Sequence, residues 1–429
     1  MRLTGGTAYR PPVAPSAGPA PRERLTGGRI AAFVVALFLL LLYSGGWELP
    51  LLGENATEAG SAILRVAFLP AYAAGFALIA LEPGQAARAL VRQPFLLILL
   101  AVAAGSMLWS IAPDVTARRT FALVCTTLGG VALASRFRWS VLAEVVAAAF
   151  AVLIVASFVA CLVFPSVGVM TELFPGAWRG LWREKNGLGG MMAFGFCILS
   201  AAALLNPPRA KLWGTFAVLA VVLVLMSTSK TSLVSLMLGV GALGFVLIVR
   251  RGPAAGAAAT WTGVTGVLLI AAFILFASDV FFAILGKDAT LTGRTKIWSA
   301  ALREIEQRPW LGYGYQAVWG DTSGWGPFAW ISKNAGFQAQ HAHNSWLEQW
   351  LGMGLVGLIA WGLFYLQTLT LAVIAVFRDR GALLAFPFLV VYSLVALTES
   401  IAVTYNDLRW TLFVAFAVKL AFPDRALDR

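Results

Sequence analysis

Hydrophobic residues occur in long runs along most of the chain, and short polar segments separate these runs. The runs are roughly 14 to 30 residues long, and most of them could cross a bilayer core of about 30 Å as an α-helix. Backbone polar groups must be paired inside a membrane, and a helix pairs them within a single segment. The pattern therefore predicts an all-α polytopic membrane protein.

About twelve transmembrane helices can be drawn on this pattern. Their expected ranges are 29–45, 61–81, 95–110, 119–134, 140–164, 188–205, 212–229, 231–249, 260–278, 345–375, 382–398 and 409–422. The chain thus divides into spans 1–9 (29–278), a large loop domain (279–344), spans 10–12 (345–422) and two tails. The tail 1–28 is basic and rich in Pro, Gly and Ala, which predicts disorder. The tail 423–429 is short.

Composition supports this class. Hydrophobic residues make up 59% of the chain and charged residues 12%, with a mean hydropathy of +0.81. A soluble domain carries roughly twice that share of charge. Arginines precede the first span, so the positive-inside rule predicts a cytoplasmic N-terminus and, after twelve crossings, a cytoplasmic C-terminus. The loop domain would then lie on the outer side, where nucleic acid is excluded as a partner despite the net charge of +12.

Several basic residues fall on the predicted outer side, where the rule expects few. Solvated loop charge is one interpretation of these residues, and binding of an anionic ligand is the other. Lys185 begins the sixth span beside Asn186, and Lys230 ends the seventh span beside a group of hydroxyl residues that includes Ser229. Snorkelling could explain Lys230. Helix starts attract anions through free N–H groups, however, so a diphosphate is the ligand that these residues favour.

The loop domain is expected to contain one amphipathic helix within "TGRTKIWSAALREIEQRP". Thr292 could cap this helix, which would put Arg294 in its first turn, and Pro309 would end it. The apolar stripe consists of Ile297, Trp298, Ala301, Leu302 and Ile305. The glycine- and aromatic-rich segment 310–330 follows, and its rings could either stack on sugars or form an interfacial belt.

The two histidines of the chain, His341 and His343, lie just before the tenth span. Ser345 to Glu348 fits a capping box, so the span is expected to start at Ser345, with His343 and Asn344 at the outer surface. Gly352, Gly354 and Gly357 would let another helix approach closely.

These histidines could bind a metal, serve a structural role or take part in chemistry. A metal site needs three or four ligands, and the sequence offers no third histidine and no cysteine outside a span. Glu348 would lie about 140° round the helix from His343, which is poorly placed for a ligand. A structural role is possible, but a general base or acceptor-binding role for His343 is favoured because imidazole titrates near neutral pH. No metal and no disulfide are expected.

Together these motifs resemble the O-antigen ligase and O-antigen polymerase superfamily of bacterial envelope enzymes. His343 and Asn344 with Gly354 and Gly357 form H-N-x9-G-x-x-G, which is similar to the ligase signature. "LTGRTKIW" with "RPWLGYGY" resembles the loop-helix motif of the family, which makes Arg294 the counterpart of its essential loop arginine. "STSKTSL" and "EKN" resemble two further family motifs, with Lys230 where members often carry arginine.

The resemblance implies a metal-independent, inverting glycosyltransferase of the bacterial inner membrane whose site faces the periplasm. The donor would be a saccharide on undecaprenyl diphosphate, with no soluble cofactor. The acceptor would be a second lipid-linked oligosaccharide in a polymerase, the favoured alternative, or lipid A-core in a ligase. His343 would accept the proton of the attacking hydroxyl, while Arg294, Lys230 and Lys185 would neutralise the diphosphate. A flippase is disfavoured, since the expected spans carry no charge near their centres.

Overall fold

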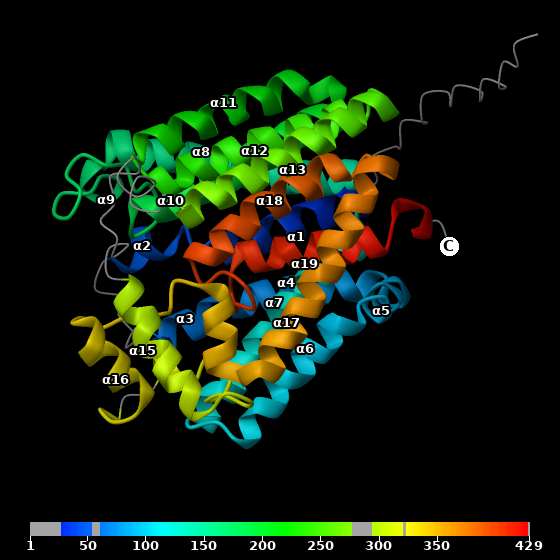
Figure 1. Ribbon diagram of the computed structural model, residues 1–429. Helices are drawn as coiled ribbons and strands as arrows, with labels where there is room; N and C mark the ends of the chain where they lie inside the picture. The colour runs from blue at the N-terminus through cyan, green and yellow to red at the C-terminus, as the bar shows by residue number, and fades with distance from the viewer. Residues whose placement is uncertain (1–26, 54–60, 277–293, 321–322, 428–429) are drawn as a thin grey trace, which may run out of the picture.

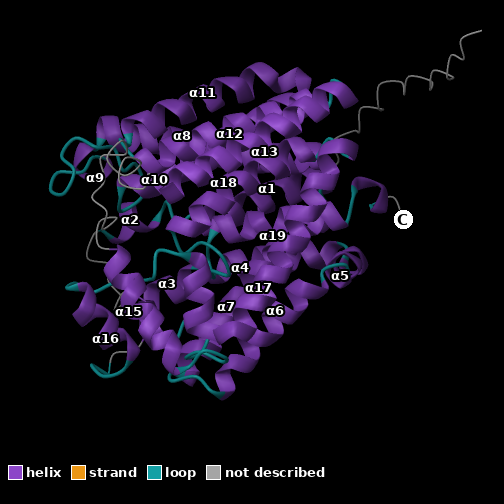
Figure 2. Ribbon diagram, viewed as in Figure 1, coloured by secondary structure: helices purple, strands orange, loops and turns teal. Residues whose placement is uncertain are grey.

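The computed structural model describes residues 27–53, 61–276, 294–320 and 323–427, and this part of the chain is helical apart from loops and one isolated bridge between Val169 and Trp178. The α-helices, shown in Figures 1 and 2, are α1 (Gly27–Tyr43), α2 (Glu48–Leu52), α3 (Ser61–Ala67), α4 (Leu69–Leu81), α5 (Pro83–Val91), α6 (Pro94–Gly105), α7 (Pro113–Arg136), α8 (Trp139–Val163), α9 (Pro165–Gly168), α10 (Lys185–Leu205), α11 (Ala210–Met226), α12 (Lys230–Val249), α13 (Pro253–Phe276), α15 (Arg294–Gln307), α16 (Pro327–Ala335), α17 (Ser345–Arg378), α18 (Ala382–Thr398) and α19 (Leu408–Ala421).

The prediction of a polytopic, all-α membrane protein is confirmed. Among the described residues, five helices are long and apolar enough to cross a membrane: α8, α10, the helical stretch 207–226 that contains α11, α12 and α17. The pair α5 and α6, bent by 90°, could make a sixth span, and α1, α4 and α18 are shorter apolar helices. Each of the twelve expected ranges overlaps a helix. The number of crossings and the side on which the loop domain lies remain predictions.

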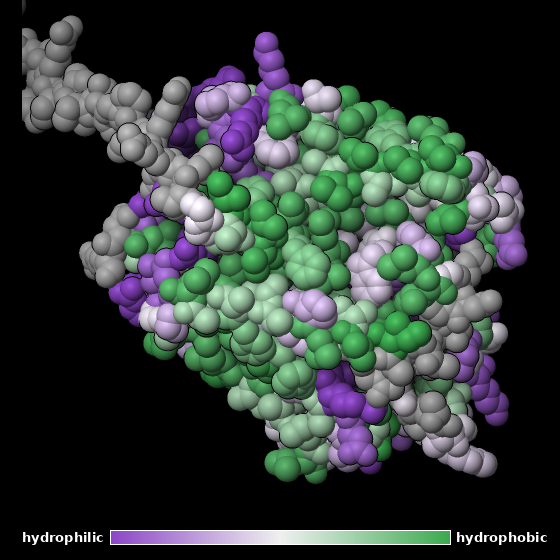
Figure 3. Space-filling model, turned by 180° about the vertical axis from the view of Figure 1, so that it is seen from behind, coloured by the Kyte–Doolittle hydropathy of each residue, from purple (hydrophilic) through white to green (hydrophobic). Residues whose placement is uncertain are grey.

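The helices form a bundle whose exposed face is mostly hydrophobic between two hydrophilic zones (Figure 3). Inside the bundle α10 packs against α8, α11, α12 and α18, while α7 packs against α19 and α4. Aromatic side chains join α17, α18 and α19, and the ring of Phe413 lies 5.3 Å from Trp361 and 4.6 Å from Tyr392. Such contacts between rings add to the effect of burial, so they fix the positions of these three helices.

The predicted amphipathic helix is confirmed as α15, which buries Ile297, Ala301 and Ile305 in a second, smaller core. This core also contains Ile331 of α16 and Leu351 of α17, so the loop domain is packed against the start of α17 (Figure 1). The expected cap Thr292 lies outside the described residues.

The tenth predicted span begins at Ser345, as expected, but the capping box is wrong. Asn344 caps α17, because its Oδ1 accepts hydrogen bonds from the backbone N–H groups of Trp346 at 2.9 Å and Leu347 at 3.1 Å. The buried carboxylate of Glu348 accepts bonds from Trp319, Ala342 and Ser400 instead. It therefore ties three loop segments to the helix.

Gly354 and Gly357, the glycines of the histidine motif, lie at a kink in α17 rather than at a contact with another helix. Gly354 has φ +66° inside α17, and a Cβ there would lie 2.2 Å from the backbone of Trp310. A Cβ on Gly357 would lie 2.2 Å from the Met353 side chain. The expected approach of another helix is therefore corrected: the kink lets the loop around Trp310 reach α17.

We predict that the α15–α16 region and the α5 end of the bundle lie on opposite membrane faces. A cysteine at the exposed position Lys333 in α16 should react with an impermeant maleimide added to intact spheroplasts, whereas one at the exposed Arg88 in α5 should react only after permeabilisation. Cys125, Cys161 and Cys197 are buried, so the parent protein is the blank. Labelling of both variants before permeabilisation would reject the predicted topology.

Candidate functional site

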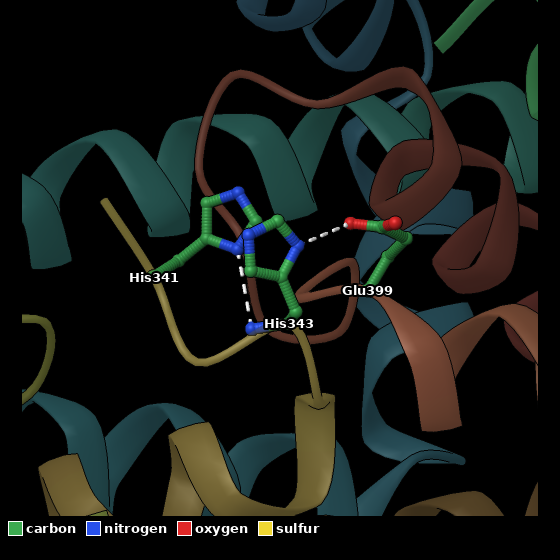
Figure 4. Close-up of side chains that lie close together, drawn as sticks. All are labelled: His341, His343 and Glu399. Atoms are coloured by element: carbon green, nitrogen blue, oxygen red, sulfur yellow. Dashed lines mark hydrogen bonds and ion pairs between the residues drawn. The ribbon is translucent and has the colours of Figure 1, made fainter. Parts of the chain in front are cut away.

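A histidine–carboxylate pair lies between the loop domain and the end of α18 (Figure 4). The Nδ1 atom of His343 is 3.0 Å from Oε2 of Glu399, and Oε1 of the same carboxylate is 2.6 Å from Nη2 of Arg294. Burial raises the pKa of Glu399, but the hydrogen bond from His343 and the charge of Arg294 outweigh it and hold the pKa at about 2. Glu399 is thus ionised at neutral pH.

The ionised carboxylate decides which nitrogen of His343 carries hydrogen. A carboxylate can only accept, so Nδ1–H of His343 must donate to Glu399 when the ring is neutral. The lone pair then sits on Nε2, the nitrogen that points away from the pair. About 28% of the His343 side chain is exposed. The arrangement provides an oriented base of the kind found in hydrolase triads.

Hydrogen bonds between their two loops hold His343 and Glu399 in fixed positions relative to each other. The hydroxyl of Ser345 donates to the carbonyl of Glu399 at 2.8 Å and accepts from the N–H groups of Ile401 and Ala402. Asn344 adds a bond from its Nδ2 to the carbonyl at 397, at 3.3 Å. The two loops that carry the pair are therefore joined directly to the first turn of α17.

His341 supports the loop from the other side of His343. The rings lie 3.9 Å apart, and Nδ1 of His341 accepts the backbone N–H of His343 at 3.3 Å (Figure 4). Burial, followed by the charge of His343, lowers the pKa of His341 to about 3. His341 is therefore neutral at physiological pH and acts as an acceptor. His343 itself has φ +51°, a left-handed conformation that few side chains adopt.

A second ion pair, between Asp407 and Arg409, lies at the start of α19. Asp407 caps α19 and binds the side chain of Arg409, with Nη2 and Oδ2 2.5 Å apart. Glu48 of α2 is half-buried, and desolvation raises the pKa of its carboxyl; the charge of Arg183 lowers this pKa, and the charge of Asp407 raises it.

The two lysines predicted to bind phosphate lie together at the adjoining starts of α10 and α12. Nζ of Lys185 is 3.4 Å from the Thr228 hydroxyl and 3.7 Å from the ring centroid of Phe174. The hydroxyl of Ser229 donates to Oδ1 of Asn186 at 2.8 Å, and Ser229 also caps α12. The charge of Lys230 acts on Lys185. Two cations and two helix N-termini thus converge, which suits an anion.

The predicted site residues therefore form two clusters. His343, Asn344 and Arg294 lie in the histidine cluster with Glu399, and Lys185, Asn186, Ser229 and Lys230 lie in the lysine cluster. Gly354 and Gly357 lie further along α17, in the kinked segment.

Sequence reasoning missed Glu399, although the partner that a histidine needs is usually a carboxylate. It also counted too few metal ligands, because Glu399 with His341 and His343 forms a group that could hold an ion. Both oxygens of Glu399 already have partners, however, and one partner is the cation Arg294. A divalent ion would have to displace Arg294 or share the carboxylate with it, so the donor set fits a metal poorly.

Comparison with known proteins identifies the class. Residues 215–362, about a third of the chain, match the family model described as O-antigen ligase. The range contains His343, Arg294 and Lys230 but neither Lys185 nor Glu399. The predicted resemblance is thus confirmed.

A curated relative is the exopolysaccharide production protein ExoQ of Rhizobium meliloti (strain 1021). It is 32% identical over 194 residues, which cover 42% of this chain and 43% of that protein. The chain therefore matches less than half of the length of this relative.

Glu399→Gln should disable the base while keeping the volume of the side chain. An amide presents either a donor or an acceptor to Nδ1, so the ring loses its fixed tautomer, and loss of the orienting carboxylate in a triad costs up to about 10⁴-fold in rate. We expect kcat of the glycosyl transfer proposed below to fall at least 100-fold, because a general base typically contributes about that factor to the rate.

The control for that experiment is Glu306→Gln in α15, which removes one carboxylate from an exposed position. This variant should keep the parent rate. A Glu399→Gln enzyme with parental kcat would show that Glu399 does not orient the base.

His341→Asn should make stability less sensitive to acid. The folded pKa of His341 is about 3, below the usual value of 6.5, so the unfolded chain binds the extra proton between these values. Folded protein is therefore destabilised as pH falls from about 6.5 towards 3. The asparagine oxygen can still accept the N–H of His343. We expect a smaller drop in the midpoint of thermal unfolding between pH 7 and pH 5 than in the parent; an equal drop would refute the proposed neutral state of His341.

Proposed function

We propose that the chain is a metal-independent, inverting glycosyltransferase that moves a saccharide from undecaprenyl diphosphate to a sugar hydroxyl on the periplasmic side of the bacterial inner membrane. The observation that supports this most directly is the bond between His343 and Glu399, which leaves Nε2 of His343 as a base. The reaction needs a base for the hydroxyl and cations for the leaving group. The histidine cluster would supply the base, and Arg294 with the lysine cluster would supply the cations.

In the proposed step, the acceptor oxygen attacks C1 of the donor sugar from the face opposite the diphosphate. Its proton passes to Nε2 of His343 while the new C1–O bond forms. The bond between C1 and the phosphate oxygen breaks, and undecaprenyl diphosphate leaves with the electron pair, so the configuration at C1 inverts. Glu399 stabilises the imidazolium that results, as a carboxylate does in a triad.

Each of the cations would neutralise part of the negative charge of the leaving diphosphate. The lysine cluster carries two positive charges at helix starts, so it suits the diphosphate. Arg294 uses Nη2 for Glu399, and a guanidinium has further N–H donors that could reach a phosphate oxygen. Asn186 and Ser229 would orient the phosphates through hydrogen bonds.

The acceptor is proposed to be a second lipid-linked oligosaccharide, which makes the enzyme a polymerase. The relative named as an exopolysaccharide production protein supports this choice. Attachment of the glycan to lipid A-core, the ligase reaction, is the alternative.

A flippase would need charged groups along a path through the bilayer. Among the described residues, the most deeply buried charged side chains are Glu304 in the loop domain, Glu348 in the first turn of α17 and Lys419 near the end of α19. Lys419 pairs with Asp424 at 2.9 Å, beyond the helix end. This distribution favours an enzyme whose reaction takes place at one membrane face over a flippase.

The test is deletion of the gene in the source bacterium, with separate analysis of exopolysaccharide and lipopolysaccharide. We expect long exopolysaccharide to disappear while capped lipopolysaccharide persists. The parent gene should restore the polymer, and His343→Ala and Arg294→Ala genes expressed at the same level should not, since loss of one charge-stabilising donor typically costs about 100-fold or more.

The converse result, loss of capped lipopolysaccharide alone, would establish the ligase alternative. EDTA should leave the activity of the purified parent unchanged. Loss of activity with EDTA, restored by one divalent ion, would replace the metal-free mechanism with one that uses His341, His343 and Glu399 as ligands.

A further inference from the structure

A groove with a cationic rim lies at the end of the bundle opposite the candidate site. It has a volume of about 840 Å³ and runs between α13 and the last turns of α17. The straight part of α17 after the kink spans 24 residues (355–378), or roughly 36 Å at 1.5 Å per residue. The groove thus lies at the C-terminal end of α17, whereas His343 precedes the first residue of that helix, and neither the proposed reaction nor the two clusters use it.

The walls of the groove are apolar and belong to α12, α13 and α17. Val249 ends α12, Trp261 and Val264 belong to α13, and Val376 and Phe377 belong to α17. Trp261 is 74% exposed and Phe377 is 60% exposed. One side of α13 packs against α12. The groove lies between another side of α13 and α17. Apolar side chains at this depth meet lipid, so an acyl chain is the occupant that suits the walls.

The rim carries three arginines: Arg250, Arg378 and Arg380. Burial lowers the pKa of Arg250, and the charge of Arg380 lowers it further, so the two guanidinium groups lie close enough to repel each other. Asp379 is the acidic residue beside them, and its Oδ1 accepts the N–H of Gly381 at 2.8 Å. One carboxylate against three guanidinium groups leaves a net positive rim.

We propose that this groove binds an anionic glycerophospholipid, with an acyl chain between α13 and α17 and the phosphate on Arg250, Arg378 and Arg380. Basic pockets between membrane helices are suited to such headgroups. The lipid would fill the gap beside α13 and so hold this helix against the bundle. A zwitterionic lipid lacks the net charge to satisfy the rim, and free phosphate lacks the chain to fill the groove.

The experiment uses the full chain in detergent and native mass spectrometry with phosphatidylglycerol titrated in. The double variant Arg378→Gln/Arg380→Gln removes two exposed guanidinium groups and leaves Arg250 in its contact with the Asp379 carbonyl. An arginine near an anionic headgroup contributes a factor of roughly five in affinity, so the pair should weaken binding about 25-fold.

The matched control is Arg88→Gln/Arg425→Gln, which removes two exposed arginines away from the groove. It should bind phosphatidylglycerol like the parent, and phosphatidylcholine with the same acyl chains should bind all three proteins weakly. An equal loss in both double variants, or no loss in either, would overturn the proposal. Equal binding of both lipids, or competition by inorganic phosphate alone at millimolar concentration, would also overturn it.

Discussion

The hydroxyl of Ser345 is the contact on which the candidate site depends. It makes one bond to the carbonyl of Glu399 and receives two from the following backbone. The base and its carboxylate come from segments 56 residues apart, so their 3.0 Å separation requires that both loops share one anchor. A buried hydroxyl with three partners is well suited to this, because breaking it would leave several polar groups unsatisfied. Asn344 and Glu348 extend the same anchor to the helix start and to the loop domain.

Charge is divided unevenly between the two clusters. In the histidine cluster Glu399 balances Arg294, and the neighbouring His341 is held neutral. In the separate ion pair at the start of α19, Asp407 balances Arg409. The lysine cluster keeps two positive charges on adjoining helix starts. In the proposed group transfer, the histidine cluster would accept a proton and the lysine cluster would hold the departing phosphate.

The helical class, the amphipathic helix α15 and the start of α17 could be predicted from the sequence, because hydrophobic periodicity and local motifs record these features. The sequence also pointed to seven candidate site residues, which the structure brings into two clusters and whose roles remain predictions. It failed where partners come from distant segments. Glu399 has no motif around it and is defined as a partner only by the packing of α18 against α17 and the Ser345 anchor. Likewise Ser345 and Glu348 fit a capping box, but tertiary partners claim both side chains, and Asn344 caps the helix instead. Gly354 was expected to admit another helix, but what it accommodates is the loop at Trp310.

The left-handed backbone of His343 places stability and chemistry in competition at one residue. Asparagine and glycine adopt φ near +51° more readily than histidine, so either would relieve a conformational cost of the order of 1 kcal/mol. A screen for thermostable variants that ignores activity should therefore accumulate asparagine or glycine at 343, while selection for polymer should always return histidine. Position 343 would then be identified as the base because histidine is kept there despite its cost in stability. No loss-of-function variant would be needed to find it.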